Sequence, residues 1–279
     1  MAGTLYLVGT PIGNLGDLTD RARQTLAAVD LVAAEDTRRT GRLLGGLGIR
    51  ARMVSFFEGN EEERVPEILD ALTGGADVAV VSDAGMPGLS DPGYRLVAAC
   101  IDAGIAVDVI PGPSAVVSAL VVSGLPTDRF TFEGFLPRSG KARSERLDAL
   151  AGEPRTIVLF ESPRRVASTL RDLIDSCGER RVAVVRELTK LHQEVIRGRL
   201  SEVVEQLGSR ELKGEVVLVV EGGQRPAPNE EEALRLAASL VRDGARKREA
   251  ARRVSELTGV PARRIYDGLV RSSASARTS

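Results

Sequence analysis

The sequence contains few of the side chains on which most metal, redox and covalent chemistry depends. Among 279 residues there are two cysteines, one histidine and no tryptophan, and aromatic residues make up 3%. Cys100 and Cys177 lie far apart and form no CxxC pair, which argues against a zinc site and a disulfide framework and fits a reducing compartment. His192 has no neighbouring Cys or His, so we expect no metal and interpret it as a surface residue. This pattern favours chemistry that needs neither a metal nor a covalent nucleophile.

Long apolar runs are also missing. The start MAGTLYLVGT lacks the basic residues and the apolar stretch of a signal peptide, and no segment reaches the length needed to span a bilayer. We therefore expect a cytoplasmic protein with no membrane association. Hydrophobic residues make up 43% and charged residues 28%, as in ordinary globular proteins, and the length favours two or three domains.

The net charge of −1 conceals an uneven distribution. Residues 233–279 contain eleven Lys or Arg and four acidic residues, which gives +7 for this range. Such a basic segment fits an acidic partner such as nucleic acid. A solvated, arginine-rich helical face would explain the same charge equally well.

Short apolar runs alternate with amphipathic segments over residues 1–115, which we interpret as an N-terminal α/β domain. Strands are expected at 4–9, 31–33, 52–55, 78–81 and 106–110. Helices are expected at 17–29, 37–47, 61–72 and 91–103, the last of them capped by Ser90 or Asp91. This alternation predicts a parallel sheet covered by helices, with a ligand at the carboxyl ends of the strands.

Residues 116–222 predict a second α/β domain with a mixed sheet. Its expected strands are 129–133, 156–161, 182–187, 194–198 and 215–221, and its expected helices lie near 144–150, 164–176 and 200–207. The segment 222–229 is rich in Gly and Pro, as linkers often are. Residues 229–279 then predict a small, basic, helical C-terminal domain of two or three helices, similar in form to a helix-turn-helix.

Three loops rich in Gly and Pro, at 9–13, 85–93 and 111–115, each follow a strand of the first predicted sheet. The first has the position of a Rossmann phosphate loop, but Pro11 stands where the second glycine belongs and has no N–H to donate to phosphate. A tight strand-to-helix turn explains part of this composition, and close approach of the backbone to a ligand explains the rest. We expect the three loop tips to meet in one cleft.

Eight short motifs of the sequence resemble those of a known protein family. VGTPIGNL, AEDTRRTGRLL, SDAGMPGLSDPG, PGPSA, GFLPR, FESPRR, RELTKLHQE and KGEVVLVVEG stand in this order between about Gly3 and Gly222. The sequence thereby resembles the ribosomal RNA small subunit methyltransferase I family of the tetrapyrrole methylase superfamily. The resemblance implies a two-domain α/β fold with S-adenosylmethionine (SAM) in the interdomain cleft and, usually, a homodimer. It also implies 2′-O-methylation of a cytidine in the decoding region of 16S rRNA.

The same resemblance implies a set of site residues. The expected SAM contacts are Pro11, Asp83, Gly85, Met86, Ser114, Ala115, Phe160 and Leu188. The expected RNA contacts are Arg38 and Arg164 in these motifs and, because of the +7 charge of residues 233–279 and the clustered cations at 246–253, also Arg246, Lys247, Arg252 and Arg253. The family commonly has Thr at position 86 and His at position 164, so Met86 removes a hydroxyl, whereas Arg164 keeps a cation suited to phosphate.

A ribose hydroxyl is a poor nucleophile, so a nearby carboxylate would help as a general base. Glu35, Asp36 and Glu161 are the candidates, and the same three carboxylates also suit ordinary ion pairs. Two other functions stay open: methylation of a tetrapyrrole or another small substrate, and RNA binding without catalysis. The basic helical segment argues against the first, and the loops at strand ends argue against the second.

Overall fold

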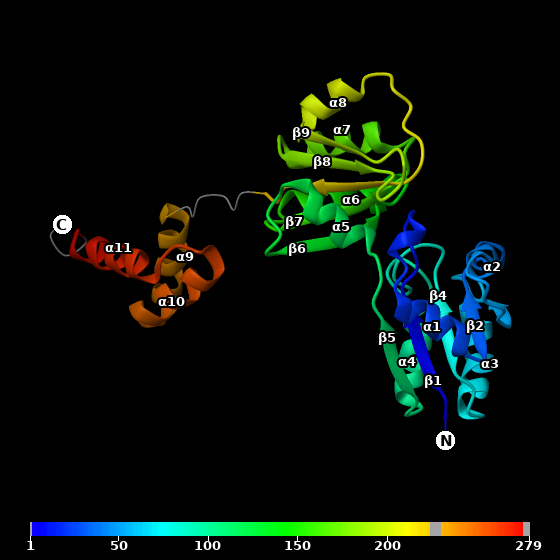
Figure 1. Ribbon diagram of the computed structural model, residues 1–279. Helices are drawn as coiled ribbons and strands as arrows, with labels where there is room; N and C mark the ends of the chain where they lie inside the picture. The colour runs from blue at the N-terminus through cyan, green and yellow to red at the C-terminus, as the bar shows by residue number, and fades with distance from the viewer. Residues whose placement is uncertain (1, 224–229, 276–279) are drawn as a thin grey trace. The chain divides into compact units, whose positions relative to one another are not determined.

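The computed structural model describes residues 2–223 and 230–275. The chain forms two compact units, Met1–Gly222 and Gly223–Ser279 (Figure 1). Positions 224–229 of the expected linker, together with residues 276–279, lie outside the described residues. Within the described parts of the chain, no helix is both long and apolar enough to cross a membrane.

The first unit begins with a five-stranded sheet in the order β3-β2-β4-β1-β5. Its strands are β1 (Thr4–Val8), β2 (Leu31–Ala34), β3 (Met53–Ser55), β4 (Val78–Val81) and β5 (Ala106–Ile110). All four pairings are parallel, which confirms the prediction of a parallel sheet. The carboxyl ends of all five strands therefore meet at one edge, where the three Gly/Pro loops begin.

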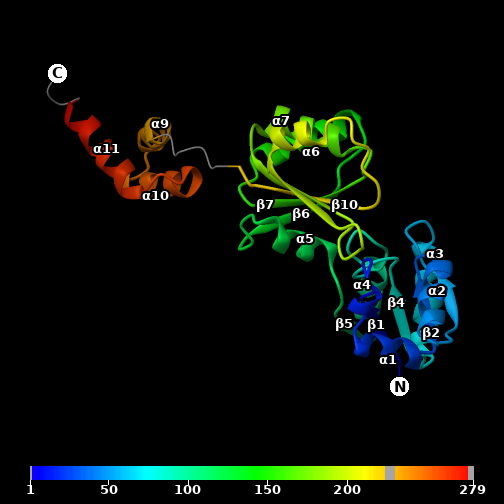
Figure 2. The same ribbon diagram turned by 45° about the horizontal axis from the view of Figure 1, so that its top comes forward.

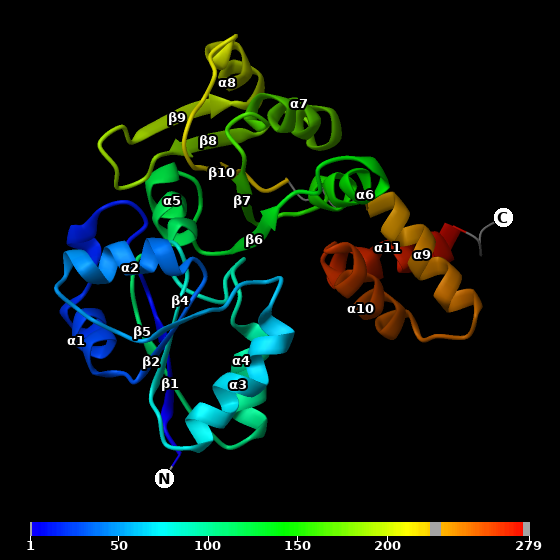
Figure 3. The ribbon, with the colours of Figure 1, turned by 90° about the vertical axis from the view of Figure 1, so that its right-hand side faces the viewer.

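Helices cover both faces of this sheet (Figure 3). Helices α3 (Glu61–Thr73) and α4 (Tyr94–Asp102) pack Ile68 and Leu96 against Leu5 on one face. Helices α1 (Asp20–Ala28) and α2 (Thr37–Gly46) pack Leu26 and Leu44 on the other. A short 3₁₀ turn, η1 (Leu15–Asp17), precedes α1. Successive side chains of a strand point to opposite faces, so each central strand feeds both apolar layers.

The predicted cap of α4 is wrong. Ser90 and Asp91 lie before the helix, and Gly93 is the N-cap residue, with φ at +138° and no side-chain cap hydrogen bond. Ser90 itself has a positive φ of 61°. The Asp-Pro-Gly sequence therefore builds a turn that keeps Asp91 out of the helix, and that carboxylate is available to the site described below.

The second sheet has the order β6-β7-β10-β8-β9. Its strands are β6 (Phe130–Phe135), β7 (Thr156–Glu161), β8 (Arg181–Arg186), β9 (Glu194–Arg199) and β10 (Val216–Val220). The β6–β7 pair is parallel and the other pairs are antiparallel, so the prediction of a mixed sheet is confirmed. Both sheets lie within one compact unit, and a domain division at residue 115 stays a prediction.

Helices again cover both faces of the second sheet (Figure 2). Helices α6 (Gly140–Ala151), α7 (Val166–Cys177) and α8 (Leu200–Leu207) pack on one face. Helix α5 (Ala115–Ser123) packs Val116, Ala119 and Leu120 against the other. This helix follows β5 directly, so the loop 111–115 joins the first sheet to the layer that covers the second.

The second unit contains α9 (Glu230–Arg242), α10 (Lys247–Thr258) and α11 (Ala262–Ser275). They enclose a small core that includes Ala237, Ala250, Val254, Ile265 and Leu269. The first turn of α9 carries three glutamates. Residues 230–279 therefore have eleven basic and seven acidic side chains, a net +4, which is less than the +7 of residues 233–279.

Candidate functional site

Two of the Gly/Pro loops are joined by a pair of backbone hydrogen bonds. The Thr10 N–H donates to the Gly85 carbonyl at 2.9 Å, and the Gly85 N–H donates to the Thr10 carbonyl at 3.1 Å. Gly85 has φ at +87°, a conformation that side chains with a Cβ rarely adopt. The β1–α1 and β4–α4 loops thereby form one ridge at the carboxyl edge of the first sheet, with a cavity on each side.

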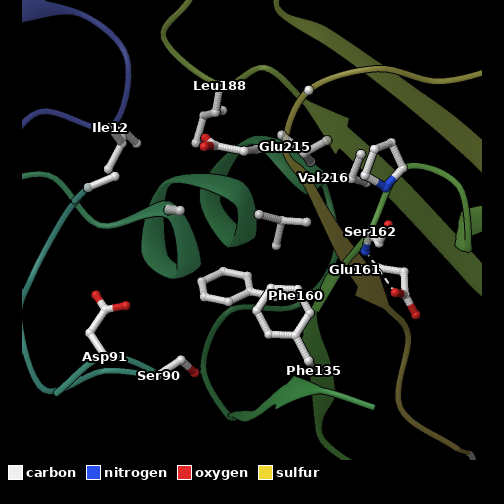
Figure 4. A pocket seen from close by; sticks show the side chains of 16 residues that line it. Ile12, Ser90, Asp91, Phe135, Phe160, Glu161, Ser162, Leu188, Glu215 and Val216 are labelled. Atoms are coloured by element: carbon white, nitrogen blue, oxygen red, sulfur yellow. Dashed lines mark hydrogen bonds between the residues drawn. The ribbon is translucent and has the colours of Figure 1, made fainter. Parts of the chain in front are cut away.

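The first cavity lies between this ridge and the second sheet and has a volume of ≈ 340 Å³ (Figure 4). Its walls are mainly apolar and come from loops of the first sheet, from α5 and from strands of the second sheet. The lining residues are Ile12, Ala84, Ser90, Asp91, Ala115, Phe135, Phe160, Glu161, Ser162, Pro163, Val185, Leu188, Gly214, Glu215, Val216 and Val217. Small-molecule sites in proteins commonly have about 300–1,000 Å³ and such walls with a few polar groups.

Asp91 is the most strongly perturbed acid of this cavity. Its pKa is raised to about 6, chiefly by burial and also by the negative charges of Glu35 and Asp83, whereas a hydrogen bond from Ser82 opposes the change. Figure 4 places Asp91 and Ser90 on the side opposite Glu161. A half-buried carboxylate beside an apolar space is suited to bind a cation or to accept hydrogen bonds from hydroxyl groups.

An aromatic cluster forms another wall. The Phe160 ring packs edge-on against Phe132, with ring centroids 4.9 Å apart, and lies 5.6 Å from the centroid of Phe135. Phe135 is 60% exposed, which is unusual for so large an apolar side chain. The planes of Phe135 and Phe160 are tilted by 57°, so these two rings form an angled, partly open aromatic wall against which a planar ring can pack.

The carboxylate of Glu161 is held by protein donors. It accepts hydrogen bonds from the Thr169 hydroxyl at 2.6 Å and from the Ser162 N–H at 2.7 Å, and it pairs with Arg165 at 3.4 Å. Its side chain is 1% exposed and points away from Asp91 (Figure 4). Glu161 therefore lines the cavity mostly with its backbone, while its charge fixes the end of β7 to α7.

The loop after β8 brings Leu188 into the cavity through an unusual backbone. Glu187 and Thr189 have positive φ values of 51° and 65°. Lys190 holds this loop, because its ammonium contacts Glu187 at 2.8 Å and Glu215 at 3.0 Å. Strained residues fixed by ion pairs are typical of preorganised ligand sites.

The second cavity, on the far side of the ridge, has a volume of ≈ 350 Å³ and includes Pro11 and Asp83. The Asp83 Oδ2 lies 3.1 Å from Arg39, while its Oδ1 is buried without a hydrogen-bond partner. Burial raises the pKa of Asp83, and Arg39 opposes this effect. Glu35 accepts a hydrogen bond from the Asp83 N–H at 3.0 Å, so its carboxylate supports the β4 loop.

Asp36 caps α2, and its side chain accepts from the N–H groups of Arg38 and Arg39. The Arg38 N–H lowers the pKa of Asp36. Ala115, Phe160 and Leu188 are the predicted cofactor residues that line the first cavity, and Pro11 and Asp83 line the second. Gly85, Met86 and Ser114 line neither, although Gly85 builds the ridge between them.

The glycines of the first and third loops serve packing between the loops. A Cβ on Gly9 would lie 2.6 Å from the Gly112 Cα, and one on Gly112 would lie 2.8 Å from the Gly9 Cα. Met86 is the third neighbour, with its Sδ 2.8 Å from the same position on Gly9. These contacts explain the two glycines without close approach of a ligand to their backbones.

The predicted RNA residues are all on the surface or close to it. Arg38 is 85% exposed and lies 3.4 Å from Asp36, and Arg164 is exposed. The other four belong to the second unit. Arg246, Arg252 and Arg253 are exposed there, while Lys247 is partly buried and donates to the Leu269 carbonyl at 3.4 Å. Within the described residues, no group of three or more His, Cys, Asp or Glu is arranged to hold a metal ion.

Sequence reasoning missed several residues of the cavities. The sequence pattern indicates a helix cap at Asp91 and gives no separate signal for Phe135, Glu215, Arg39 and Arg42, all of which line a cavity. All five stand inside four of the family motifs: Asp91 in SDAGMPGLSDPG, Phe135 in GFLPR, Glu215 in KGEVVLVVEG, and Arg39 and Arg42 in AEDTRRTGRLL. The motifs therefore marked the correct segments, but not which side chains turn inward.

The fold and the cavity between the two sheets define a methylase. A family model described as Tetrapyrrole (Corrin/Porphyrin) Methylases matches residues 4–204. A solved uroporphyrin-III-C-methyltransferase from Thermus thermophilus is 25% identical, with a TM-score of 0.55, over 78% of this chain and 94% of that one. A cobalt precorrin-4 methyltransferase shares the fold, with a TM-score of 0.57 over 78% of this chain and 94% of its own, at 18% identity.

Curated relatives narrow the assignment. A protein named ribosomal RNA small subunit methyltransferase I from Synechocystis sp. is 47% identical to this chain, over 95% of this chain and 96% of that protein. A protein of the same name from Mycobacterium tuberculosis is 48% identical, over 97% of this chain and 96% of that protein. The chain thus belongs to the tetrapyrrole methylases and, among them, to the ribosomal RNA small subunit methyltransferase I family. A relative of the same name from Thermotoga maritima is 53% identical over 220 residues, which are 79% of this chain but 99% of that protein. That relative is therefore about as long as the first unit alone.

Proposed function

We propose that this protein transfers a methyl group from SAM to the ribose 2′-hydroxyl of a cytidine in the decoding region of 16S rRNA, in the cytoplasm. The observation that carries the proposal is the first cavity, in which the Asp91 carboxylate faces apolar and aromatic walls. The names of the curated relatives support the RNA substrate.

The residues of this cavity fit SAM. Its aromatic and aliphatic walls, among them Phe160, Leu188 and Val217, suit the adenine ring. The carboxylates of Asp91 and Glu215 suit the ammonium group and the ribose hydroxyls, and Asp83 adds negative charge nearby. When bound, SAM supplies a methyl group on a positively charged sulfur that leaves as a neutral thioether. An acidic surrounding therefore favours the bound donor over its neutral product.

We propose that the chain itself contributes chiefly binding and orientation. Of the three carboxylates considered as a base, only Glu161 lines the first cavity, and three donors already hold it. Glu35 supports the β4 loop and Asp36 caps α2. Because the leaving group is already activated, placing the hydroxyl in line with the methyl group can provide most of the rate. A positioning role for Glu161 is tested below.

Small ribosomal subunits or 16S rRNA are the proposed partner, and we retain the expectation of a homodimer. On α5, Val117 and Val121 are 52% and 67% exposed, whereas the neighbouring Val116 and Leu120 are buried in the core. The stretch 116–122 thus contains both core residues and an exposed apolar face, which supports a role in self-association.

The test is transfer of labelled methyl groups to purified small subunits and to free 16S rRNA, followed by mapping of ribose methylation. Label at a single cytidine 2′-oxygen of the decoding region is the expected result. A uroporphyrin-type tetrapyrrole serves as a competing acceptor, because a structural neighbour carries that substrate in its name. Label on the tetrapyrrole and none on RNA would overturn the proposal. SAM binding without transfer to any acceptor would leave only a binding protein.

A further inference from the structure

The second cavity has no part in the proposed binding of SAM. It lies between α2 and the β1–α1 loop, and its floor is the end of β4. The two cavities are adjacent, because Pro11 and Gly13 line the second and Ile12 the first. On the β4 side, Ser82 and Asp83 line the second cavity and Ala84 the first. Successive residues of the same two loops therefore face opposite sides of the Thr10–Gly85 ridge.

The walls of this cavity combine cations with apolar surface. One face of α2 carries Arg39 and, one helical turn further along, Arg42 and Leu43. Opposite them stands Leu15, which is 69% exposed although it is apolar. Gly46 also lines the cavity, and a Cβ added there would meet nothing within 4 Å, so the end of the groove is open.

Two polar groups of this cavity, Asp83 and Arg42, have hydrogen-bonding capacity that the protein itself does not use. Asp83 Oδ1 is buried and accepts no hydrogen bond, which is costly unless a ligand donates to it. Its other oxygen pairs with Arg39 at 3.1 Å. Arg42 is exposed and, within the described residues, makes no hydrogen bond or ion pair. The cavity thus offers two guanidinium groups, the partly exposed Asp83 carboxylate and the side chains of Leu15, Leu43 and Leu47.

A nucleotide has the three matching groups. Its phosphate suits guanidinium donors, its base suits apolar walls, and an exocyclic amino group donates to a carboxylate, as the cytosine N4 amino group does to Asp or Glu. Uracil has no amino group and presents a carbonyl oxygen in that position, which would face the carboxylate unfavourably.

We propose that the second cavity binds a nucleotide of the RNA substrate whose base carries an amino group. This nucleotide is adjacent in the strand to the one that is methylated, so the proposal rests on the proposed function. The strand crosses the Thr10–Gly85 ridge, with the reacting ribose at the first cavity and its neighbour in the second. Arg39 and Arg42 bind the phosphate, and the Asp83 carboxylate accepts from the amino group. This assigns Asp83 to RNA, in place of the cofactor contact expected from the sequence.

The test uses the full-length protein, SAM and RNA oligonucleotides that contain the target cytidine, with each flanking nucleotide changed in turn between cytidine and uridine. The wild-type protein should bind the RNA with cytidine at one flanking position about tenfold more tightly than the RNA with uridine there. Asp83→Asn should reduce this preference toward one, because an amide can also donate to a carbonyl oxygen. Arg42→Gln should weaken binding of both RNAs about equally and reduce the salt slope by about 1. Arg50→Gln, on an exposed arginine that lines neither cavity, is the control.

The affinity for SAM, measured by calorimetry, shows whether Asp83 contacts the RNA or the cofactor. Asp83→Asn should change it by no more than about threefold, since the screened effect of one charge is small. If Asp83→Asn abolishes SAM binding and leaves the flanking preference intact, Asp83 belongs to the cofactor site and the inference is overturned. It is also overturned if both variants bind and methylate RNA like Arg50→Gln. If the wild-type protein methylates no RNA, the proposed function itself fails.

Discussion

Thr10 and Gly85 exchange two backbone hydrogen bonds, at 2.9 and 3.1 Å, although 75 residues separate them in the chain. This bridge orders the two loops that supply one wall of each cavity. It also requires the positive φ of Gly85, at +87°, while a Cβ there would lie 3.3 Å from Ile12 Cγ2 and 3.4 Å from the Pro113 carbonyl oxygen. The ridge therefore depends on a glycine for its backbone shape as well as for space.

Gly85→Ala should lower the free energy of unfolding by about 1–3 kcal/mol, because it strains the backbone and tightens contacts beside Ile12. Gly88→Ala is the matched control, since Gly88 has φ at +83° but an added Cβ would meet nothing within 4 Å. Both variants should lose stability in urea titrations, and only Gly85→Ala should also weaken SAM binding. Equal SAM affinity in the two variants would mean that the ridge does not shape the cofactor site.

The raised pKa of Asp91, about 6, predicts two pH dependences. The folded protein binds this proton more tightly than the unfolded chain, whose carboxyl has the ordinary value of 3.8. Stability from this group is therefore present below the ordinary value and is lost as the pH rises through about 6. Asp91→Asn should raise the free energy of unfolding above pH 6 and have little effect at pH 4, as measured by urea unfolding at both values.

SAM binding should have the opposite dependence. If Asp91 accepts from the donor's hydroxyl or ammonium groups, affinity rises as the carboxylate ionises between pH 5 and 7. Asp91→Asn should weaken binding about 10- to 100-fold at pH 7.5 and remove this dependence. Calorimetry across the pH range checks both effects, and a variant that binds SAM like the wild-type protein would place the donor elsewhere.

Glu161→Gln tests whether the buried carboxylate acts as a base or as a support. We expect a loss of roughly 1–3 kcal/mol of stability, because one carboxylate oxygen accepts from Thr169 and the charge pairs with Arg165. The kcat at a temperature where the variant is folded should then fall less than about tenfold. Thr169→Val, which removes the same hydrogen bond, is the control and should behave alike. A general base would instead cost about 10²–10⁴ in kcat in Glu161→Gln alone.

The sequence predicts the strands of both sheets to within about two residues, because buried β-branched runs bounded by Gly and Pro have few alternatives. It also predicts that the site lies at strand ends. It does not predict that Asp83 and Asp91 face different cavities. That outcome depends on the Thr10–Gly85 bridge and on the positive φ of Ser90, which are tertiary features with no local pattern. The same limit explains Glu161, whose partners Thr169 and Arg165 are on α7 and just before it.

Val121→Lys tests the expected homodimer. Val121 is 67% exposed on α5, while Val116 and Leu120 of the same helix are buried, so a lysine there should leave the fold intact. If this face is the interface, a buried charge would shift the sedimentation of the protein from dimer to monomer at micromolar concentration. Ile101→Lys, at a residue 64% exposed on α4, is a control that should stay dimeric. A wild-type protein that sediments as a monomer would remove the expectation.

Removal of residues 223–279 tests the role of the helical unit. The Thermotoga maritima relative has about the length of the first unit, so we expect the truncated protein to fold and to bind SAM with unchanged affinity. RNA or subunit binding should weaken, because the unit carries eleven basic and seven acidic side chains over residues 230–279. Each lost phosphate contact should reduce the slope of log affinity against log salt by roughly 0.7–0.9.

Single substitutions in the full-length chain refine this test. Arg253 pairs with Glu249 at 2.8 Å, whereas Arg252 has no ion pair within the described residues. Arg252→Gln should therefore weaken RNA binding and lower the salt slope more than Arg253→Gln does. If the truncated protein binds RNA with the same affinity and the same slope as the full chain, the helical unit is a solvated appendage. The phosphate contacts would then belong to the first unit, along residues 137–146 or around Arg38, where charge substitutions should lower the slope instead.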